Sequence, residues 1–135
     1  MKFELELSDK QFQTILNALD LYGRLGTGQL KILVEVFNWH YGLDCSNKDV
    51  MNYITNIIHK LYFSDLSTGS SYGIFSDKTP DQCKIAYDLI QVLRNVDAWN
   101  KNPGGGFEVN FFEPMQCGNE NLCKMKIIDE NEEEK

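Results

Sequence analysis

The spacing of apolar residues changes twice along this chain, and that change limits the folds open to it. Apolar and polar residues alternate in the segments 2–7, 107–112 and 122–128, a period of two that predicts strands with one buried face. Between the first and second of these segments the apolar residues recur every three to four positions, which predicts helices. We therefore expect an α+β fold: a small antiparallel sheet of about three strands with three to four helices packed on one face.

Local signals mark the expected helices. Ser8 and Gln11 form a capping box before the first helix, expected over about residues 9–24. Gly26-Thr27-Gly28 then interrupts the pattern. These residues form either a tight turn or part of a continuous helix whose small side chains let another group approach the backbone. Further helical patterns run from Leu30 to Phe37 and from Val50 to Leu61. Thr79 as N-cap and Pro80 at the first helical position open a last helix, which the residues from Asn100 to Gly106 end.

The length of 135 residues fits one globular domain, expected over 1–128, followed by an acidic, disordered tail at 129–135. The tail supplies more than half of the net charge of −7, and this negative balance argues against binding to duplex nucleic acid. No apolar run is long enough for a membrane helix, and the alternating start does not read as a secretory signal. We expect a cytoplasmic protein without membrane contact.

No established catalytic motif is present, so we do not expect an enzyme, a cofactor or a metal. The chain has no phosphate-binding GxxxxGK[ST], no GxSxG and no HExxH. The four cysteines, Cys45, Cys83, Cys117 and Cys123, form no CxxC pair and are expected to be free thiols. His40 and His59 lie near no carboxylate or cysteine at a spacing that favours catalysis.

The arginines carry the strongest functional signal. The chain has eleven lysines but only two arginines, Arg24 and Arg94. Because lysine serves almost everywhere else, we expect these two positions to need the geometry of a guanidinium group. A planar guanidinium bonds phosphate or carboxylate at two points and stacks on flat rings. Each arginine could instead satisfy an internal carboxylate or a helix C-terminus, and that alternative stays open here. Four neighbours of Arg24 and two distant aromatic residues complete the candidate ligand-binding set: Tyr22, Gly26, Thr27, Gly28, Phe75 and Trp99.

Two segments resemble a family of short proteins of bacteriophages and prophages. Residues 18–29 read Ala-Leu-Asp-Leu-Tyr-Gly-Arg-Leu-Gly-Thr-Gly-Gln, and residues 86–94 read Ala-Tyr-Asp-Leu-Ile-Gln-Val-Leu-Arg. The pattern is similar to that of the Thoeris anti-defence nucleotide sponges. The resemblance implies a homo-oligomer in the cytoplasm of an infected bacterium that sequesters a cyclic ADP-ribose isomer or a cyclic oligonucleotide without cleaving it.

Carried over by residue, the resemblance gives Arg24, Gly26, Thr27 and Gly28 a phosphate or base contact at a subunit interface. It gives Arg94 a second role, facing a pyrophosphate. Two other classes of function remain open. One is an acidic protein-binding inhibitor of a host defence complex, resembling an anti-CRISPR or a nucleic-acid mimic. The other is a hydrolase that cleaves the same nucleotides.

Overall fold

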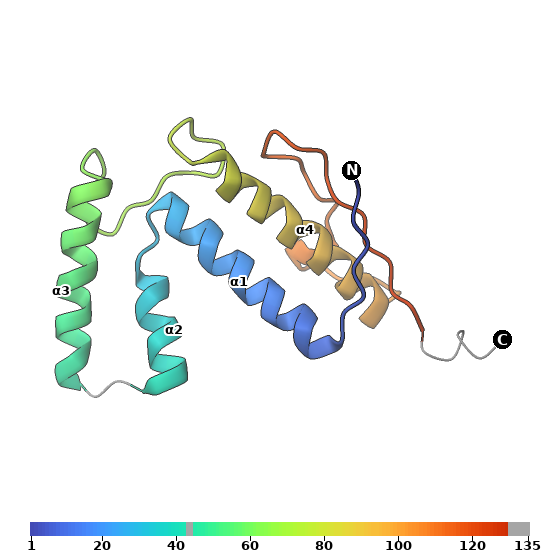
Figure 1. The fold of residues 1–135 in the computed structure, drawn as a ribbon, viewed down its shortest axis with the longest axis horizontal. Helices are drawn as coiled ribbons and strands as arrows, with labels where there is room; N and C mark the ends of the chain where they lie inside the picture. Colours follow the sequence, from blue (N-terminus) through green and yellow to red (C-terminus); the bar gives the residue numbers. More distant parts are fainter. Residues whose placement is uncertain (43–44, 130–135) are drawn as a thin grey trace.

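The computed structural model describes residues 1–42 and 45–129, and within them every regular element is helical. The helices are α1 (Asp9–Thr27), α2 (Lys31–Tyr41), α3 (Cys45–Tyr62) and α4 (Asp81–Lys101), followed by the short 3-10 helix η1 (Val109–Phe111). Helices α1 and α4 lie side by side, and α2 and α3 form a hairpin that stands beside them (Figure 1). We call the hairpin of residues 31–62 the arm. The predicted acidic tail lies outside the described residues, except for Asp129.

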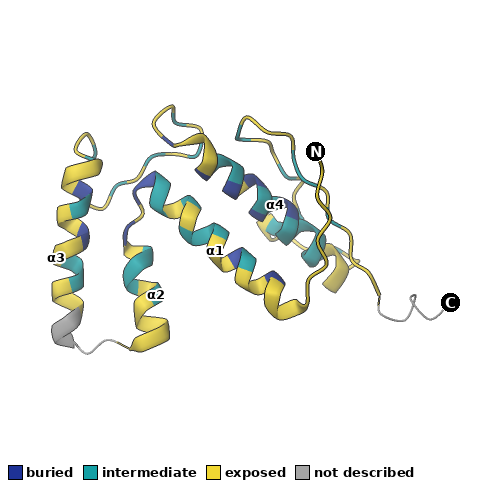
Figure 2. Cartoon of the chain, in the orientation of Figure 1, coloured by how far each residue is buried: buried dark blue, intermediate teal, exposed yellow. Residues whose placement is uncertain are grey.

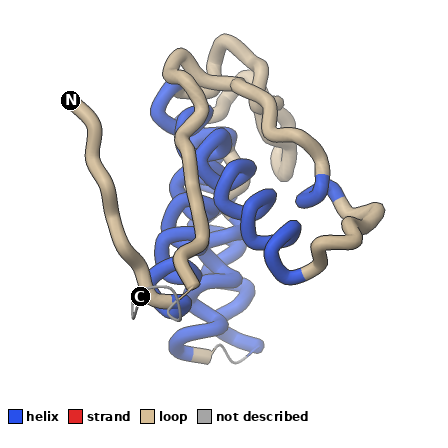
Figure 3. The backbone as a smooth tube through the Cα atoms, turned by 90° about the vertical axis from the view of Figure 1, so that its right-hand side faces the viewer, coloured by secondary structure: helices blue, strands red, loops and turns tan. Residues whose placement is uncertain are grey.

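The expected α+β fold with a three-stranded sheet is wrong, because the described residues contain no strand. Residues 2–7 and 122–128 are extended without a strand partner, and part of 107–112 forms η1 (Figure 3). Alternation shows which side chains would share a face, but a sheet also requires a second backbone at the right distance. The apolar side chains of Phe3 and Leu5, which were expected on a buried face, are exposed.

A polar stripe on α4 takes the place of a neighbouring strand. The Asp88 carboxylate accepts hydrogen bonds from the backbone N–H groups of Cys117 (2.8 Å) and Gly118 (2.8 Å). One turn on, Gln91 bonds both the N–H (3.1 Å) and the C=O (3.0 Å) of Met115. Side chains of α4 thus satisfy backbone groups that a β-ladder would otherwise pair, and they hold the segment after η1 against the helix.

The same stripe continues along α4 toward η1. Asn95 donates to the carbonyl oxygens of Asn110 and Phe112, each at 2.9 Å. The Trp99 indole N–H donates to the carbonyl of Phe111 at 3.2 Å and meets the Phe111 ring edge-on, with centroids 5.4 Å apart. The segment predicted as the second strand is therefore fixed to a helix.

Local signals predicted the helices well. The capping box at the start of α1 is confirmed: Gln11 N–H donates to Ser8 Oγ (3.4 Å), and Ser8 N–H donates to Gln11 Oε1 (2.9 Å). Gly28 ends α1 with φ of 90°, a left-handed cap that favours glycine. At α4 the N-cap is Pro80, not Thr79 as expected, because the Thr79 hydroxyl donates to the carbonyl of Gly73 (2.9 Å) within the preceding loop.

The apolar core lies between α1 and α4. Phe12 and Leu16 of α1 pack against Ile90 of α4, and Leu19, Leu93 and Met125 surround them. Buried positions in Figure 2 concentrate along this contact, whereas most of the arm is exposed or half-buried. Among the residues whose burial is described, no large side chain is completely buried, so the core is small for a chain of 15.6 kDa.

The two helices approach closely where Gly26 meets Cys83. A Cβ placed on Gly26 would lie 2.0 Å from Cys83 Sγ and 2.7 Å from its Cβ. The Cys83 thiol in turn donates to the carbonyl of Tyr22 at 3.7 Å. The absence of a side chain at Gly26 is therefore what lets α4 pack directly on α1.

We expect Gly26→Ala to destabilise the fold by about 1–3 kcal/mol, the usual cost of overpacking, despite the higher helix propensity of alanine. Urea unfolding followed by circular dichroism measures the change. Gly73→Ala is the matched control, because a Cβ there meets no atom within 4 Å. Cys83→Ala in the Gly26→Ala background should restore part of the loss. Equal stability of Gly26→Ala and the native chain would show that the contact is not tight.

Candidate ligand-binding site

Two arginines from different helices meet at one carboxylate. Arg24 lies on α1 and its Nε donates to Asp20 Oδ2 at 3.0 Å, one turn earlier on the same helix. Arg94 lies on α4 and its Nη2 stands 3.9 Å from Asp20 Oδ1. The internal carboxylate considered as an alternative partner is thus present, but a single carboxylate serves two guanidinium groups. One positive charge remains uncompensated at this point.

An open pocket of about 220 Å³ lies beside the three charged groups. Its wall combines Asp20, both arginines, Gln29, Tyr72 and Tyr87. We call it the arginine pocket. It gathers residues from α1, from α4 and from the loop between α3 and α4, so it exists only because of the tertiary fold.

Hydrogen bonds at the end of α1 orient Arg24. Its Nη1 donates to Gln29 Oε1 at 3.2 Å, and Gln29 Nε2 donates to Thr27 Oγ1 at 3.1 Å. The Thr27 hydroxyl donates to the carbonyl of Arg24 at 2.9 Å, which closes the network. Arg24 is therefore held in place while its side chain stays half-exposed.

Arg94 is held by fewer interactions than Arg24. A separation of 3.9 Å is too long for a hydrogen bond, so its attraction to Asp20 is electrostatic only. Within the described part of the chain its five N–H donors have no hydrogen-bond acceptor, and its side chain is also half-exposed. Such a guanidinium can accept an incoming anion at two points.

The loop between α3 and α4 supplies one side of the pocket. Tyr72 N–H donates to the carbonyl of Thr27 at 2.8 Å, which fixes the loop to the end of α1. The Tyr72 hydroxyl donates to Asp65, and the Lys78 ammonium pairs with the same carboxylate. Lys78 first, and Tyr72 second, lower the pKa of Asp65 from its ordinary value.

The structure brings together three of the residues predicted for the site, Arg24, Thr27 and Arg94. It places the other five outside the arginine pocket: Tyr22, Gly26, Gly28, Phe75 and Trp99. The two glycines serve packing, since Gly26 admits Cys83 and Gly28 caps α1 against the ring of Phe63. Trp99 bonds to η1, and Tyr22 and Phe75 are exposed elsewhere on the surface.

Seven residues that line the pocket were not predicted, and four of them carry polar groups: Asp20 as the shared partner, Gln29, Tyr72 and Tyr87. The spacing of four between Asp20 and Arg24 is a known signal for an ion pair on one helix. Tyr87 and Arg94 are seven residues apart and therefore lie on one face of α4. Nothing local links Tyr72 to this site, because the loop reaches it through a contact with Thr27.

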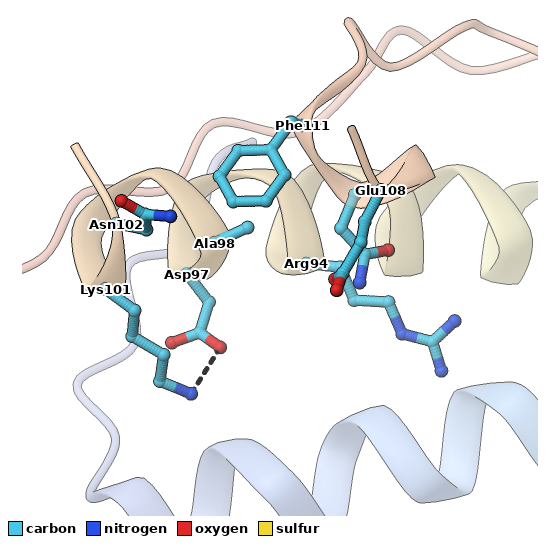
Figure 4. Close-up of a pocket in the computed structure, with 8 residues that line it drawn as sticks. Arg94, Asp97, Ala98, Lys101, Asn102, Glu108 and Phe111 are labelled. Atoms are coloured by element: carbon cyan, nitrogen blue, oxygen red, sulfur yellow. Dashed lines mark hydrogen bonds and ion pairs between the residues drawn. The ribbon is translucent and has the colours of Figure 1, made fainter. Parts of the chain in front are cut away.

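A second hollow of about 330 Å³ lies between α4 and η1. Lys101 faces it together with two carboxylates, Asp97 and Glu108, and Arg94 lines its edge. Asp97 and Lys101 already pair at 2.7 Å, and the Arg94 side chain leaves this hollow toward α1 (Figure 4). It is therefore less suited to an anion than the arginine pocket.

The groups expected to be non-catalytic have structural partners. His59 is buried and its Nε2 lies 2.8 Å from the carbonyl oxygen of Ser70, whereas His40 stacks on Trp39. Cys83, Cys117 and Cys123 are free thiols whose pKa values are raised chiefly by burial, which opposes nucleophilic reactivity at neutral pH. Among residues whose positions are described, no three His, Cys, Asp or Glu side chains gather into a group that could hold a metal.

Comparison with protein-family models, with curated proteins and with solved structures finds no match to this chain. None of the helices described is both long and apolar enough to cross a membrane. The function must therefore be argued from the geometry of the arginine pocket.

Acidification should release Tyr72 from Asp65. Because the pKa of Asp65 is lowered in the folded chain, the contact is complete above the ordinary aspartate pKa of about 4 and is lost as the pH falls through the lower, folded value. We expect the Tyr72 ring signals in an NMR titration to shift with a midpoint below that ordinary value. Asp65→Asn should abolish the transition. Tyr72 signals that do not change between pH 7 and pH 2 would contradict the assignment.

Proposed function

We propose that this chain binds a small anionic signalling nucleotide in the arginine pocket and holds it without cleaving it. The observation that carries the proposal is the convergence of Arg24 of α1 and Arg94 of α4, which are 70 residues apart in sequence, on one shared carboxylate beside an open pocket. These are the only two arginines of the chain, and they leave an excess positive charge in a protein of net charge −7.

The pocket offers complementary groups for a phosphodiester or a pyrophosphate. Arg94 would bond two phosphate oxygens, and the remaining N–H donors of Arg24 would bond a third. Asp20 can accept hydrogen bonds from ribose hydroxyl groups while it holds both guanidiniums. Tyr72 and Tyr87 border this space, where a base or sugar would pack against their rings.

The size of the pocket bears on how such a ligand would sit. About 220 Å³ is smaller than the roughly 300–1,000 Å³ of sites that enclose a whole drug-sized molecule. The pocket would therefore hold one phosphate with its sugar, and the rest of the nucleotide would extend through the open side. A ligand with two phosphates would contact the arginines with one of them or bridge both.

Sequestration is favoured over hydrolysis by the groups that surround the pocket. Its one carboxylate, Asp20, is already engaged by both arginines, with Arg24 Nε at 3.0 Å and Arg94 Nη2 at 3.9 Å, so among the described residues the pocket is lined by no uncommitted carboxylate that could activate a water. The resemblance of residues 18–29 and 86–94 to the Thoeris anti-defence nucleotide sponges also supports a phage protein that sequesters a cyclic ADP-ribose isomer or a cyclic oligonucleotide.

Isothermal titration with cyclic ADP-ribose isomers and with cyclic di- and trinucleotides tests the proposal. We expect at least one of them to bind, and Arg94→Ala and Arg24→Ala each to weaken binding by about 10- to 100-fold, the value of a hydrogen bond to a charged group. Arg94→Lys should retain only part of the affinity because lysine lacks the planar fork. Lys101→Ala, which removes another α4 cation outside the pocket, is the matched control.

Chromatography of the ligand after heat release separates sequestration from hydrolysis. Recovery of intact nucleotide supports a sponge, whereas a cleaved product would identify a hydrolase. The absence of binding to every nucleotide in the panel would overturn the proposal. Partner binding that depends on residues 129–135 and weakens steeply with salt, without any effect of the arginines, would instead identify an acidic inhibitor.

A further inference from the structure

Helix α3 buries part of its polar face and exposes an apolar face to solvent. Thr55 and His59 are buried, with 5% and 4% of their surface exposed. Four aliphatic residues of the same helix are 41% to 70% exposed: Val50, Ile54, Ile57 and Leu61. A helix on the surface of a globular protein normally buries its apolar side and exposes its polar side. The arm thus leaves uncovered the face that has most to gain from burial.

The four exposed aliphatic residues, which we call the α3 stripe, have the spacing of a helix-pairing seam. They follow one another at intervals of four, three and four residues. Alternating steps of three and four keep side chains on one narrow face, as at the a and d positions of a coiled coil. The α3 stripe therefore fits the side of another helix.

Nothing in the described chain covers this stripe. Among the helices, α3 packs only on α2, and Figure 1 shows it at the outer edge of the molecule. Trp39 and Tyr41 near the end of α2 are exposed as well, so the apolar surface continues around the arm.

We propose that the α3 stripe pairs with the α3 stripe of a second copy of this chain, with the two helices antiparallel. Intervals of four, three and four read the same from either end, so a two-fold axis between Ile54 and Ile57 superimposes the stripe on itself. Val50 of one copy then lies opposite Leu61 of the other. Such self-complementarity is what a two-fold symmetric interface requires of one surface.

Charge also favours a second copy at this place. The three lysines of residues 31–62 (Lys31, Lys48 and Lys60) balance three acidic residues (Glu35, Asp44 and Asp49). The arm is thus neutral, and the whole net charge of −7 resides outside it. Two identical acidic chains repel each other over most of their surfaces, but they can approach through the arm without that cost.

The exposed area is adequate for a dimer. The α3 stripe together with Tyr53 and Tyr62, which are also exposed, presents on the order of 600 Å² of side-chain surface. Complete burial of this surface in both copies would remove about 1,200 Å², at the lower end of the range for specific interfaces, with Tyr53 and Tyr62 at the two borders of the seam. This inference does not depend on the proposed nucleotide, because its test needs no ligand.

Sedimentation velocity of the full chain over about 1–100 μM tests the pairing. We expect a species of twice 15.6 kDa, and Ile57→Glu should weaken association by at least 100-fold because two buried carboxylates would face apolar side chains. Leu61→Lys is a second variant at a more exposed position, used if Ile57→Glu loses helicity by circular dichroism. Phe107→Glu, an exposed aromatic residue outside the arm, is the matched control and should still dimerise.

Cross-linking tests the direction of the two helices. The double variant Val50→Cys/Leu61→Cys should form a disulfide between chains, located by mapping non-reduced peptides, whereas Val50→Cys alone should not. A monomer at every concentration would overturn the proposal and leave a different protein as the occupant. A disulfide joining position 50 of both chains would overturn the antiparallel arrangement. Dissociation by Phe107→Glu to the same extent as by Ile57→Glu would move the interface away from α3.

Discussion

Gly26 of α1 lies directly against Cys83 of α4, and the short separation of these two helices depends on this contact. Phe12 and Leu16 pack on Ile90 between the same two helices, and a side chain at position 26 would push these helices apart. At this short separation the Asp20 carboxylate of α1 faces Arg94 of α4. If the helices lay further apart, the Asp20–Arg24 ion pair would remain on α1, but Arg94 of α4 would have no carboxylate beside it. The packing of two small residues therefore determines whether the arginine pocket exists.

The sequence predicted the helices because their signals are local. A capping box and apolar residues at helical spacing act within a few residues, and α1 has both. The end of α1 at Thr27, with Gly28 as its cap, lies beyond the expected end at about residue 24. The sheet could not be predicted correctly in this way, because alternation describes one segment and pairing involves two. What replaces the sheet is a row of polar side chains on α4, from Asp88 to Trp99, whose spacing is visible in the sequence but whose partners are not.

The candidate site was predictable in part for the same reason. The scarcity of arginine singled out Arg24 and Arg94 without any structural information. Their convergence depends on the crossing of α1 and α4, and the contribution of Tyr72 depends on a loop contact with Thr27. The glycines near Arg24 were expected to leave room for a ligand. The structure uses that room for Cys83 and for the end of the helix, so small residues alone did not distinguish a binding site from a packing site.

Thr27 occupies the point where three parts of the molecule meet. It borders the arginine pocket, its carbonyl anchors the loop through Tyr72, and the arm begins four residues later. A ligand that makes this junction more rigid would already restrict the motion of the arm. Binding of a partner protein to the arm would then cost less conformational entropy. Thermodynamic reciprocity then requires that fixing the arm improve retention of that molecule by the same factor. The small joint at the end of α1 is thus a place where two otherwise separate equilibria can influence each other.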